Sequence, residues 1–185
     1  MKFRFVWVVS FTLGLISVFP ALAQPYHQLR LEDFSNSSQT GESFIAYTNC
    51  NINFTFQPKQ VINGAYYLNF EFKLSVDHNR SWINRSMITS QEQLSEILKH
   101  EQGHYNLAFF ELQEMQRIFS QQRFTSNYKE EVTALFHRID ARYKQLNLDY
   151  DEDTGHMLNR KQQNSWDLWF RRKLGYNTYA YNGKQ

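Results

Sequence analysis

Two histidines and a glutamate stand close together in the segment HEQGH, residues 100–104. On a helix, His100 and His104 project from the same face, so both imidazoles can hold one Zn²⁺ at about 2.0–2.1 Å. Glu101 points about 100° away from His100, which suits a base that takes a proton from water on the metal better than a third ligand. The alternative is an ordinary helix whose histidines bind neighbouring polar groups. A third ligand elsewhere in the chain would favour the zinc site.

The elements around this segment predict where a third ligand comes from. A capping-box pattern at Ser90 begins an apolar run with helical period, which predicts a helix over 89–122. A second helix is expected over 128–148. If the two helices are antiparallel neighbours, their similar lengths return the chain to the level of His100. The acidic turn expected at 149–156 then lies beside the histidines.

The segment YDEDTGH, residues 150–156, is the stretch of the chain richest in metal-binding side chains. We expect His156 to be the third ligand, because the glycine before it lets the backbone aim the ring and neutral imidazole suits zinc. Asp151 or Asp153 is expected either to orient a liganding histidine or to replace His156 as the third ligand. Tyr150 is a candidate donor to the oxyanion that forms when water attacks a carbonyl, or it packs at a helix end.

Upstream of the histidines, apolar residues recur with a period near two. The segments 44–57 and 65–76 are rich in aromatic and β-branched residues, and Asn63-Gly64 between them favours a tight reversal. These features predict an antiparallel hairpin. A further short strand is expected around 27–34.

The sequence therefore predicts an α+β fold, in which an N-terminal antiparallel hairpin packs against a C-terminal bundle of about three helices, the first carrying the two histidines. We expect a single zincin-like domain over residues 24–185. Its parts are a strand-rich region at 24–88, a helical region at 89–174 that ends with a third helix over 157–174, and a loosely ordered tail at 175–185.

The first 23 residues have the layout of a secretory signal peptide. Lys2 and Arg4 precede an apolar run over 5–19, and the triplet ALA at 21–23 supplies a small-residue cleavage site. The run is shorter than the roughly 20 residues needed to span a bilayer, so we expect cleavage rather than an uncleaved membrane anchor. The mature protein would then be exported, to the periplasm or outside the cell, without stable membrane insertion.

The charge balance excludes some partners. Removal of this leader lowers the 20 basic residues by Lys2 and Arg4, which leaves a number equal to the 18 acidic residues. No basic excess remains to hold nucleic acid or anionic lipid. Cys50 is the only cysteine, so no internal disulfide is possible, and we expect it to be a small buried hydrophobe.

The segment LKHEQGHYNLAFFEL, residues 98–112, resembles the helix motif of the bacterial domain of unknown function 922, described as predicted secreted zinc-dependent proteases. The segment at 150–156, followed by a helix containing QQNSW, is similar to that family's second motif, Y-D-x-x-T-x-H. The upstream segments LRLEDF, FIAYTNCNIN and FEFKLSVDHNRSWI are similar to its N-terminal strands. The resemblance covers nearly the whole mature chain.

This resemblance implies roles for individual residues. His100 and His104 would be zinc ligands, Glu101 the catalytic residue and His156 the third ligand. Asn106 stands where the family typically carries aspartate. If that aspartate supports a liganding histidine, the Asn106 amide would still accept a hydrogen bond but would add no negative charge.

We therefore expect an exported zinc-dependent hydrolase, specifically a peptidase that acts on peptides or proteins through water activated by Glu101. One alternative is a zinc-stabilised, non-catalytic binding module of the cell envelope, which a closed fourth coordination position would favour. A metal-free structural protein is another, and it would leave the three histidines apart. The sequence does not indicate the oligomeric state.

Overall fold

The structure is a computed structural model that describes residues 24–36 and 44–182. The expected signal peptide lies outside these residues, as does the chain end at 183–185. The fold is α+β, with two antiparallel sheets of two strands each in the N-terminal half, followed by three helices. In chain order the elements are η1 Leu31–Asp33, β1 Ala46–Tyr47, β2 Cys50–Ile62, β3 Ala65–Val76, β4 Trp82–Ile83, η2 Arg85–Met87, α1 Gln91–Gln121, α2 Tyr128–Thr154 and α3 Arg160–Asn182.

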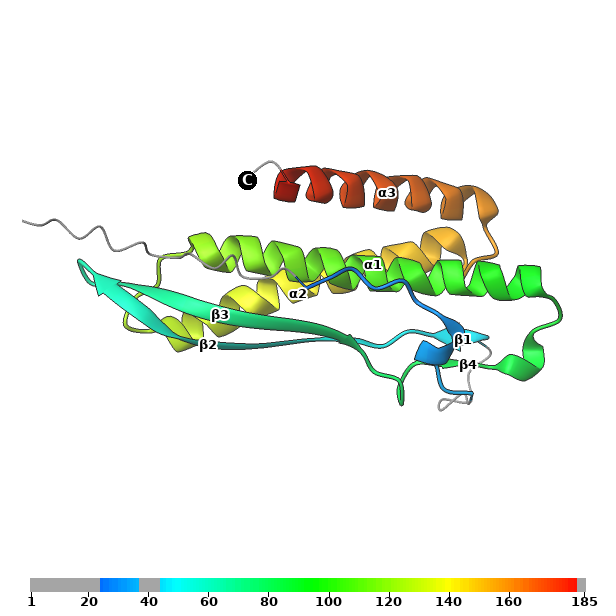
Figure 1. The fold of residues 1–185 in the computed structure, drawn as a ribbon, viewed down its shortest axis with the longest axis horizontal. Helices are drawn as coiled ribbons and strands as arrows, with labels where there is room; N and C mark the ends of the chain where they lie inside the picture. The colour runs from blue at the N-terminus through cyan, green and yellow to red at the C-terminus, as the bar shows by residue number, and fades with distance from the viewer. Residues whose placement is uncertain (1–23, 37–43, 183–185) are drawn as a thin grey trace, which may run out of the picture.

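Helix α1 lies at the centre of the molecule and contacts the hairpin and both other helices. The hairpin of β2 and β3 runs along one side of α1, and α3 lies on the opposite side (Figure 1). Helix α2 returns beside α1 and also contacts α3. Every large element therefore packs against α1, which brings residues from distant parts of the chain to its surface.

The predicted hairpin is confirmed. β2 and β3 pair antiparallel, and the turn between them places Asn63 and Gly64 at φ values of 50° and 78°, the left-handed conformation that an Asn-Gly turn favours. Alternate side chains of the hairpin face the helices. The rings of Phe54 and Phe72 pack against Phe119 of α1 at centroid distances of 5.8 and 5.7 Å. This aromatic layer joins the hairpin to the helical half.

The predicted start of the first helix is also confirmed. The Ser90 side chain accepts a hydrogen bond from the backbone N–H of Gln93 at 3.1 Å, which caps α1. The backbone N–H of Thr89 donates to the Gln93 side chain at 2.6 Å, so donors on both sides of the cap are satisfied.

The prediction of a short strand around 27–34 is wrong. The backbone there forms the single 3-10 turn η1, because the Asp33 carboxylate accepts a hydrogen bond from the backbone N–H of Arg30 at 2.7 Å. A side-chain acceptor of this kind competes with strand pairing and favours a turn. Ser35, just beyond the turn, still pairs in parallel with Trp82.

Two helix ends differ from the prediction. The acidic turn expected at 149–156 is mostly helix, since α2 continues to Thr154 and ends at Gly155, which has a left-handed φ of 54°. Helix α3 continues past the expected end at residue 174 and takes in most of the predicted loose tail. No proline follows Pro58 in the sequence, so nothing forces either helix to stop earlier.

Candidate metal centre

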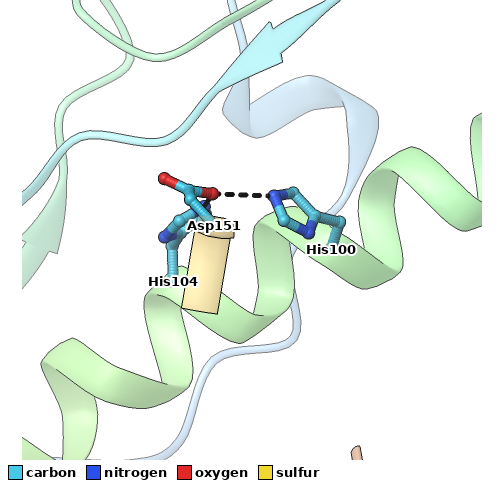
Figure 2. Close-up of side chains that lie close together, drawn as sticks. All are labelled: His100, His104 and Asp151. Carbon is cyan, nitrogen blue, oxygen red and sulfur yellow. Dashed lines mark hydrogen bonds and ion pairs between the residues drawn. The ribbon is translucent and has the colours of Figure 1, made fainter. Parts of the chain in front are cut away.

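His100 and His104 lie one turn apart on α1 and point toward the same carboxylate of α2. Their Nε2 atoms are 3.2 and 3.1 Å from Oδ1 of Asp151. Figure 2 shows the two imidazoles on either side of this oxygen. Among the described residues these three form one group whose ligand atoms all lie within 4.8 Å of one another. The structure thus places Asp151, rather than Asp153, beside the histidine pair.

The Nδ1 atom of each histidine forms a hydrogen bond with an amide oxygen. Nδ1 of His100 lies 3.2 Å from Oε1 of Gln163, and Nδ1 of His104 lies 2.9 Å from Oδ1 of Asn147. An amide oxygen only accepts, so each Nδ1 carries a hydrogen and donates it. Each Nε2 then faces the centre, as in metal sites where a second hydrogen bond fixes the ligand ring. Asn147 lies in no motif, and Gln163 lies in the segment QQNSW, for which the sequence predicted no role.

Glu101 is buried next to this group. Only 3% of its surface is exposed, and its Oε2 accepts a hydrogen bond from the hydroxyl of Thr48 at 2.6 Å. Thr48 directly follows β1, so the small β1–β4 sheet positions the partner of the glutamate. Thr48 is a further residue for which the sequence predicted no role.

His156 lies at the edge of the centre. Its Nδ1 is 3.4 Å from Oδ1 of Asp151, so all three expected histidines converge on one carboxylate oxygen. Its side chain is 51% exposed, and its ring packs on Phe44 at a centroid distance of 4.6 Å. The backbone is left-handed at His156 and Met157, with φ of 48° and 74°. A non-glycine residue in this conformation costs on the order of 1–3 kcal/mol, so the packing around this segment must hold it in place.

Tyr150, expected either as an oxyanion donor or as a packing residue at a helix end, has its hydroxyl bonded to neighbouring protein groups. Its side chain is fully buried, and its hydroxyl donates to the carbonyl of His100 at 3.0 Å and accepts from Nε2 of Gln163 at 2.8 Å. Burial raises the pKa of this hydroxyl far above its usual range. The ring stacks on that of His100 at 4.8 Å. Tyr150 therefore packs against α1 beside His100 and holds this part of the helix in place.

Gly103 explains how the tyrosine comes so close to α1. A Cβ atom at this position would lie 2.2 Å from the Tyr150 hydroxyl oxygen. Any larger residue would push the ring away from the helix, so the glycine inside the HEQGH segment is required by packing.

Asn106 and Asp153 do not support the histidines. The Asn106 oxygen accepts from the hydroxyl of Tyr26 at 2.7 Å, and Asp153 accepts from the indole N–H of Trp166 at 2.9 Å. Each residue lies two positions after its neighbour in the centre, His104 or Asp151. Two helical positions turn the side chain about 200° away, which explains both placements.

The electrostatics of the centre favour positive charge. Burial lowers the pKa of His104, but the hydrogen bond with Asp151 and the negative charges of Glu101 and Asp151 outweigh it and raise that pKa to about 9. Burial raises the pKa of Asp151, but the hydrogen bonds and charges of His100 and His104 bring it well below its usual range. Two buried or half-buried carboxylates therefore face two imidazoles, a donor set that suits a divalent cation.

The centre opens into a cleft of about 780 Å³. Its floor contains His100, Glu101, His104 and Asp151. Its walls come from the segment around β1 and from the residues after α2, and are largely apolar. The wall residues with large exposed apolar surface are Phe44 (40%), Tyr47 (49%) and Leu158 (83%).

The segment of the chain that contains this centre matches a known protein family. Residues 22–157 match a family described as bacterial protein of unknown function (DUF922). The chain belongs to this family. The matched segment includes the whole histidine motif and ends just after His156, so α3 follows it. No curated protein and no solved structure matches the chain. In the part of the chain that the structure describes, none of the helices is long and apolar enough to cross a bilayer.

Cys50 is partly buried rather than a core residue. Burial, together with the negative charges of Glu101 and Glu111, raises the pKa of its thiol to about 12. A thiol in this environment stays protonated and unreactive at neutral pH.

Proposed function

We propose that this protein is an exported zinc-dependent peptidase. The observation that carries the proposal is the convergence of two imidazole nitrogens and one carboxylate oxygen beside the buried Glu101, at the floor of an open cleft. In this proposal His100, His104 and Asp151 hold the metal, and Glu101 is the general base. The export of the protein is supported by the signal-peptide pattern of residues 1–23.

The donor atoms fit zinc in number and spacing. Three protein ligands are usual in catalytic zinc sites, and ligands that hold the ion tetrahedrally at about 2.0–2.1 Å lie about 3.3 Å from one another. The distances of 3.2 and 3.1 Å from the Nε2 atoms to Oδ1 of Asp151 are close to this spacing. The ligand atoms of all three residues lie within 4.8 Å of one another.

When bound there, zinc would polarise a substrate carbonyl and lower the pKa of a water molecule toward about 7. The chain's own residues supply the remaining steps. Glu101, held by the Thr48 hydroxyl, takes the proton of the attacking water and passes it to the departing amine. Burial of Glu101 keeps bulk water from competing for this carboxylate.

The walls of the cleft favour a polypeptide as the substrate. Phe44, Tyr47 and Leu158 expose apolar surface around a polar floor, and such surfaces accept the side chains of a peptide while its backbone approaches the polar groups. A small, highly polar substrate would leave these walls in contact with water.

A second function is favoured by the position of His156. If His156 binds the metal in addition to Asp151, or in its place with a fourth protein ligand, the coordination is closed and the site is structural. The protein would then be a zinc-stabilised binding module of the envelope without catalytic activity. The distance of 3.4 Å from Nδ1 of His156 to Asp151 makes this arrangement accessible.

Metal analysis combined with cleavage of a peptide library tests the proposal. We expect about one zinc per chain, lost in His100→Ala and kept in His137→Ala, which changes an exposed histidine on α2. Glu101→Gln should keep the zinc and lose hydrolysis. Wild-type protein that binds no zinc after dialysis against the free ion would contradict the proposal.

His156→Ala separates the two functions. In the peptidase the variant keeps its zinc, because His100, His104 and Asp151 remain. In the binding module it loses a ligand, and the visible spectrum of the cobalt-substituted protein changes as water replaces the imidazole. A zinc-loaded wild type without any peptidase activity, together with this spectral change, would establish the binding module instead.

A further inference from the structure

Gln163 of α3 is buried, with 1% of its surface exposed, and its side-chain amide has partners on all sides. Oε1 lies 3.2 Å from Nδ1 of His100. Nε2 donates to the Tyr150 hydroxyl at 2.8 Å and to Oδ1 of Asp167 at 3.0 Å. The amide therefore connects α3 to a residue at the floor of the cleft.

Asp167, which lies on the same helix as Gln163, determines which way this amide points. Asp167 is paired with Lys99 of α1 at 2.8 Å, so its carboxylate can only accept hydrogen bonds. The NH₂ group of Gln163 must then face Asp167, which turns Oε1 toward His100. If the amide were flipped, two oxygens would face each other and the imidazole would face an NH₂ group.

The orientation of the amide in turn determines the state of His100. Because Oε1 has no hydrogen, Nδ1 of His100 must carry one and donate it. Nε2 faces the Asp151 carboxylate at 3.2 Å, so its lone pair becomes available to a ligand when a cation replaces the proton between these two atoms. An ion pair at the edge of the molecule thus sets the tautomer of a buried imidazole through one amide.

We propose that Gln163 and Asp167 are positioning residues that hold His100 as its Nδ1–H tautomer and present Nε2 to the metal. This inference rests on the proposed zinc site. Helix α3, which carries Gln163 and Asp167, lies after the segment that matches the family. Mutation of a residue that hydrogen-bonds to a liganding histidine typically lowers metal affinity about 10- to 100-fold.

Two variants of neighbouring glutamines test the proposal. Gln163→Leu keeps the approximate shape of the side chain and removes the acceptor, while Gln162→Leu makes the same change at an exposed position of the same helix. We expect zinc affinity, measured by competition with a chromophoric chelator, to fall about 10- to 100-fold in Gln163→Leu. Gln162→Leu should bind zinc as the wild type does. Equal affinity in a folded Gln163→Leu protein would overturn the proposal.

The tautomer of His100 is a second readout, which a purely structural role would not change. Long-range ¹H–¹⁵N NMR spectra distinguish Nδ1–H from Nε2–H imidazoles. We expect Nδ1–H at His100 in Asp151→Ala, which lacks the competing carboxylate on the Nε2 side, and loss of that state when Gln163→Leu is added, in metal-free protein at alkaline pH. This measurement needs no zinc, so it still tests the amide if wild type fails to bind the ion and the proposed function fails. Nδ1–H in both proteins would overturn the inference.

Asp167→Asn provides the test if Gln163→Leu does not fold. This variant keeps Gln163 but gives its amide a partner that can donate, so the amide is no longer held in one orientation. We expect a smaller loss of zinc affinity, of about tenfold or less, and a mixture of His100 tautomers. Unchanged affinity and a single unchanged tautomer would show that Asp167 does not act on the imidazole.

Discussion

The two halves of α1 are both buried, but by different means. After Asn106 the helix buries Leu112, Met115 and Phe119, each at most 1% exposed, against the aromatic side of the hairpin. Before Asn106 it buries His100 and Glu101, at 4% and 3% exposed, in a network of hydrogen bonds.

The apolar half gains stability from each ring it removes from water, and each contact contributes separately. In the polar half, stability depends on every partner being present, since a buried group that loses its partner costs about 1–3 kcal/mol. One end of the helix therefore anchors the fold, and the other holds groups that a soluble helix would normally expose. Burial of such groups at this cost supports the proposed metal centre.

The largest effect is expected in the apolar half. Phe119→Ala removes a ring that contacts Phe54, Phe70 and Phe72, and we expect a loss of about 3–5 kcal/mol in the free energy of unfolding. Urea unfolding measures it. At low urea, where the variant is still folded, its zinc affinity should equal that of wild type. A parallel loss of zinc affinity would show that the two halves are coupled.

Gly103→Ala should lower both the stability of the protein and its affinity for zinc. The new Cβ would collide with the Tyr150 hydroxyl, and overpacking of this kind costs about 1–3 kcal/mol. Because Tyr150 also supports His100, we expect weaker zinc binding in chelator competition. Gly175→Ala is the matched control, since nothing lies within 4 Å of a Cβ there. Equal behaviour of the two variants would refute the role of Gly103.

Glu111 is a half-buried carboxyl in the apolar half of α1 and gives a pH-dependent test. Burial, with the negative charge of Asp140, raises the pKa of this carboxyl from its ordinary value of 4.5 to about 7 in the folded protein. The folded state then binds more protons than the unfolded state between these two values, so stability falls as pH rises through this window.

Glu111→Gln should remove this pH dependence. We expect the variant to be more stable than wild type by about 1–2 kcal/mol at pH 8, and equal to it below about pH 4.5. Thermal unfolding across the pH range measures the difference, with Glu130→Gln at an exposed position of α2 as the control. A variant less stable than wild type at pH 8 would mean that Glu111 is held as a charged group.

The smallest effect concerns the cap of α1. Ser90→Ala removes the hydrogen bond to the Gln93 N–H and should cost about 1 kcal/mol, without changing zinc affinity. Ser95→Ala, at an exposed position inside the same helix, should not destabilise the protein. A fall in zinc affinity in Ser90→Ala would show that the start of α1 contributes to the order of the proposed metal centre.

The parts of the molecule that local patterns determine were predictable. The Asn63-Gly64 turn, the Ser90 cap and the spacing of His100 and His104 each depend on residues adjacent in sequence. These features need no knowledge of tertiary packing. The convergence of α2 on the histidines followed from the similar helix lengths once the helices were taken as antiparallel neighbours.

The remaining parts of the centre depend on where α2 ends. A turn at 149–156 was expected, so Asp151 and Asp153 were equivalent candidates; in a continuous helix they face opposite sides. The same continuity puts Asn147 and Asp151 four residues apart on one face, opposite the histidine pair. Thr48 and Gln163 reach the centre from other elements, and no local pattern identifies either of them.

The zinc K-edge X-ray absorption spectrum of the metal-loaded wild-type protein shows directly which side chains hold the ion. We expect about two imidazole nitrogens and carboxylate or water oxygens at about 2.0–2.1 Å, and loss of the carboxylate contribution in Asp151→Ala. A spectrum with three imidazoles that is unchanged in Asp151→Ala, or a wild-type protein that retains no zinc to measure, would contradict the proposed centre.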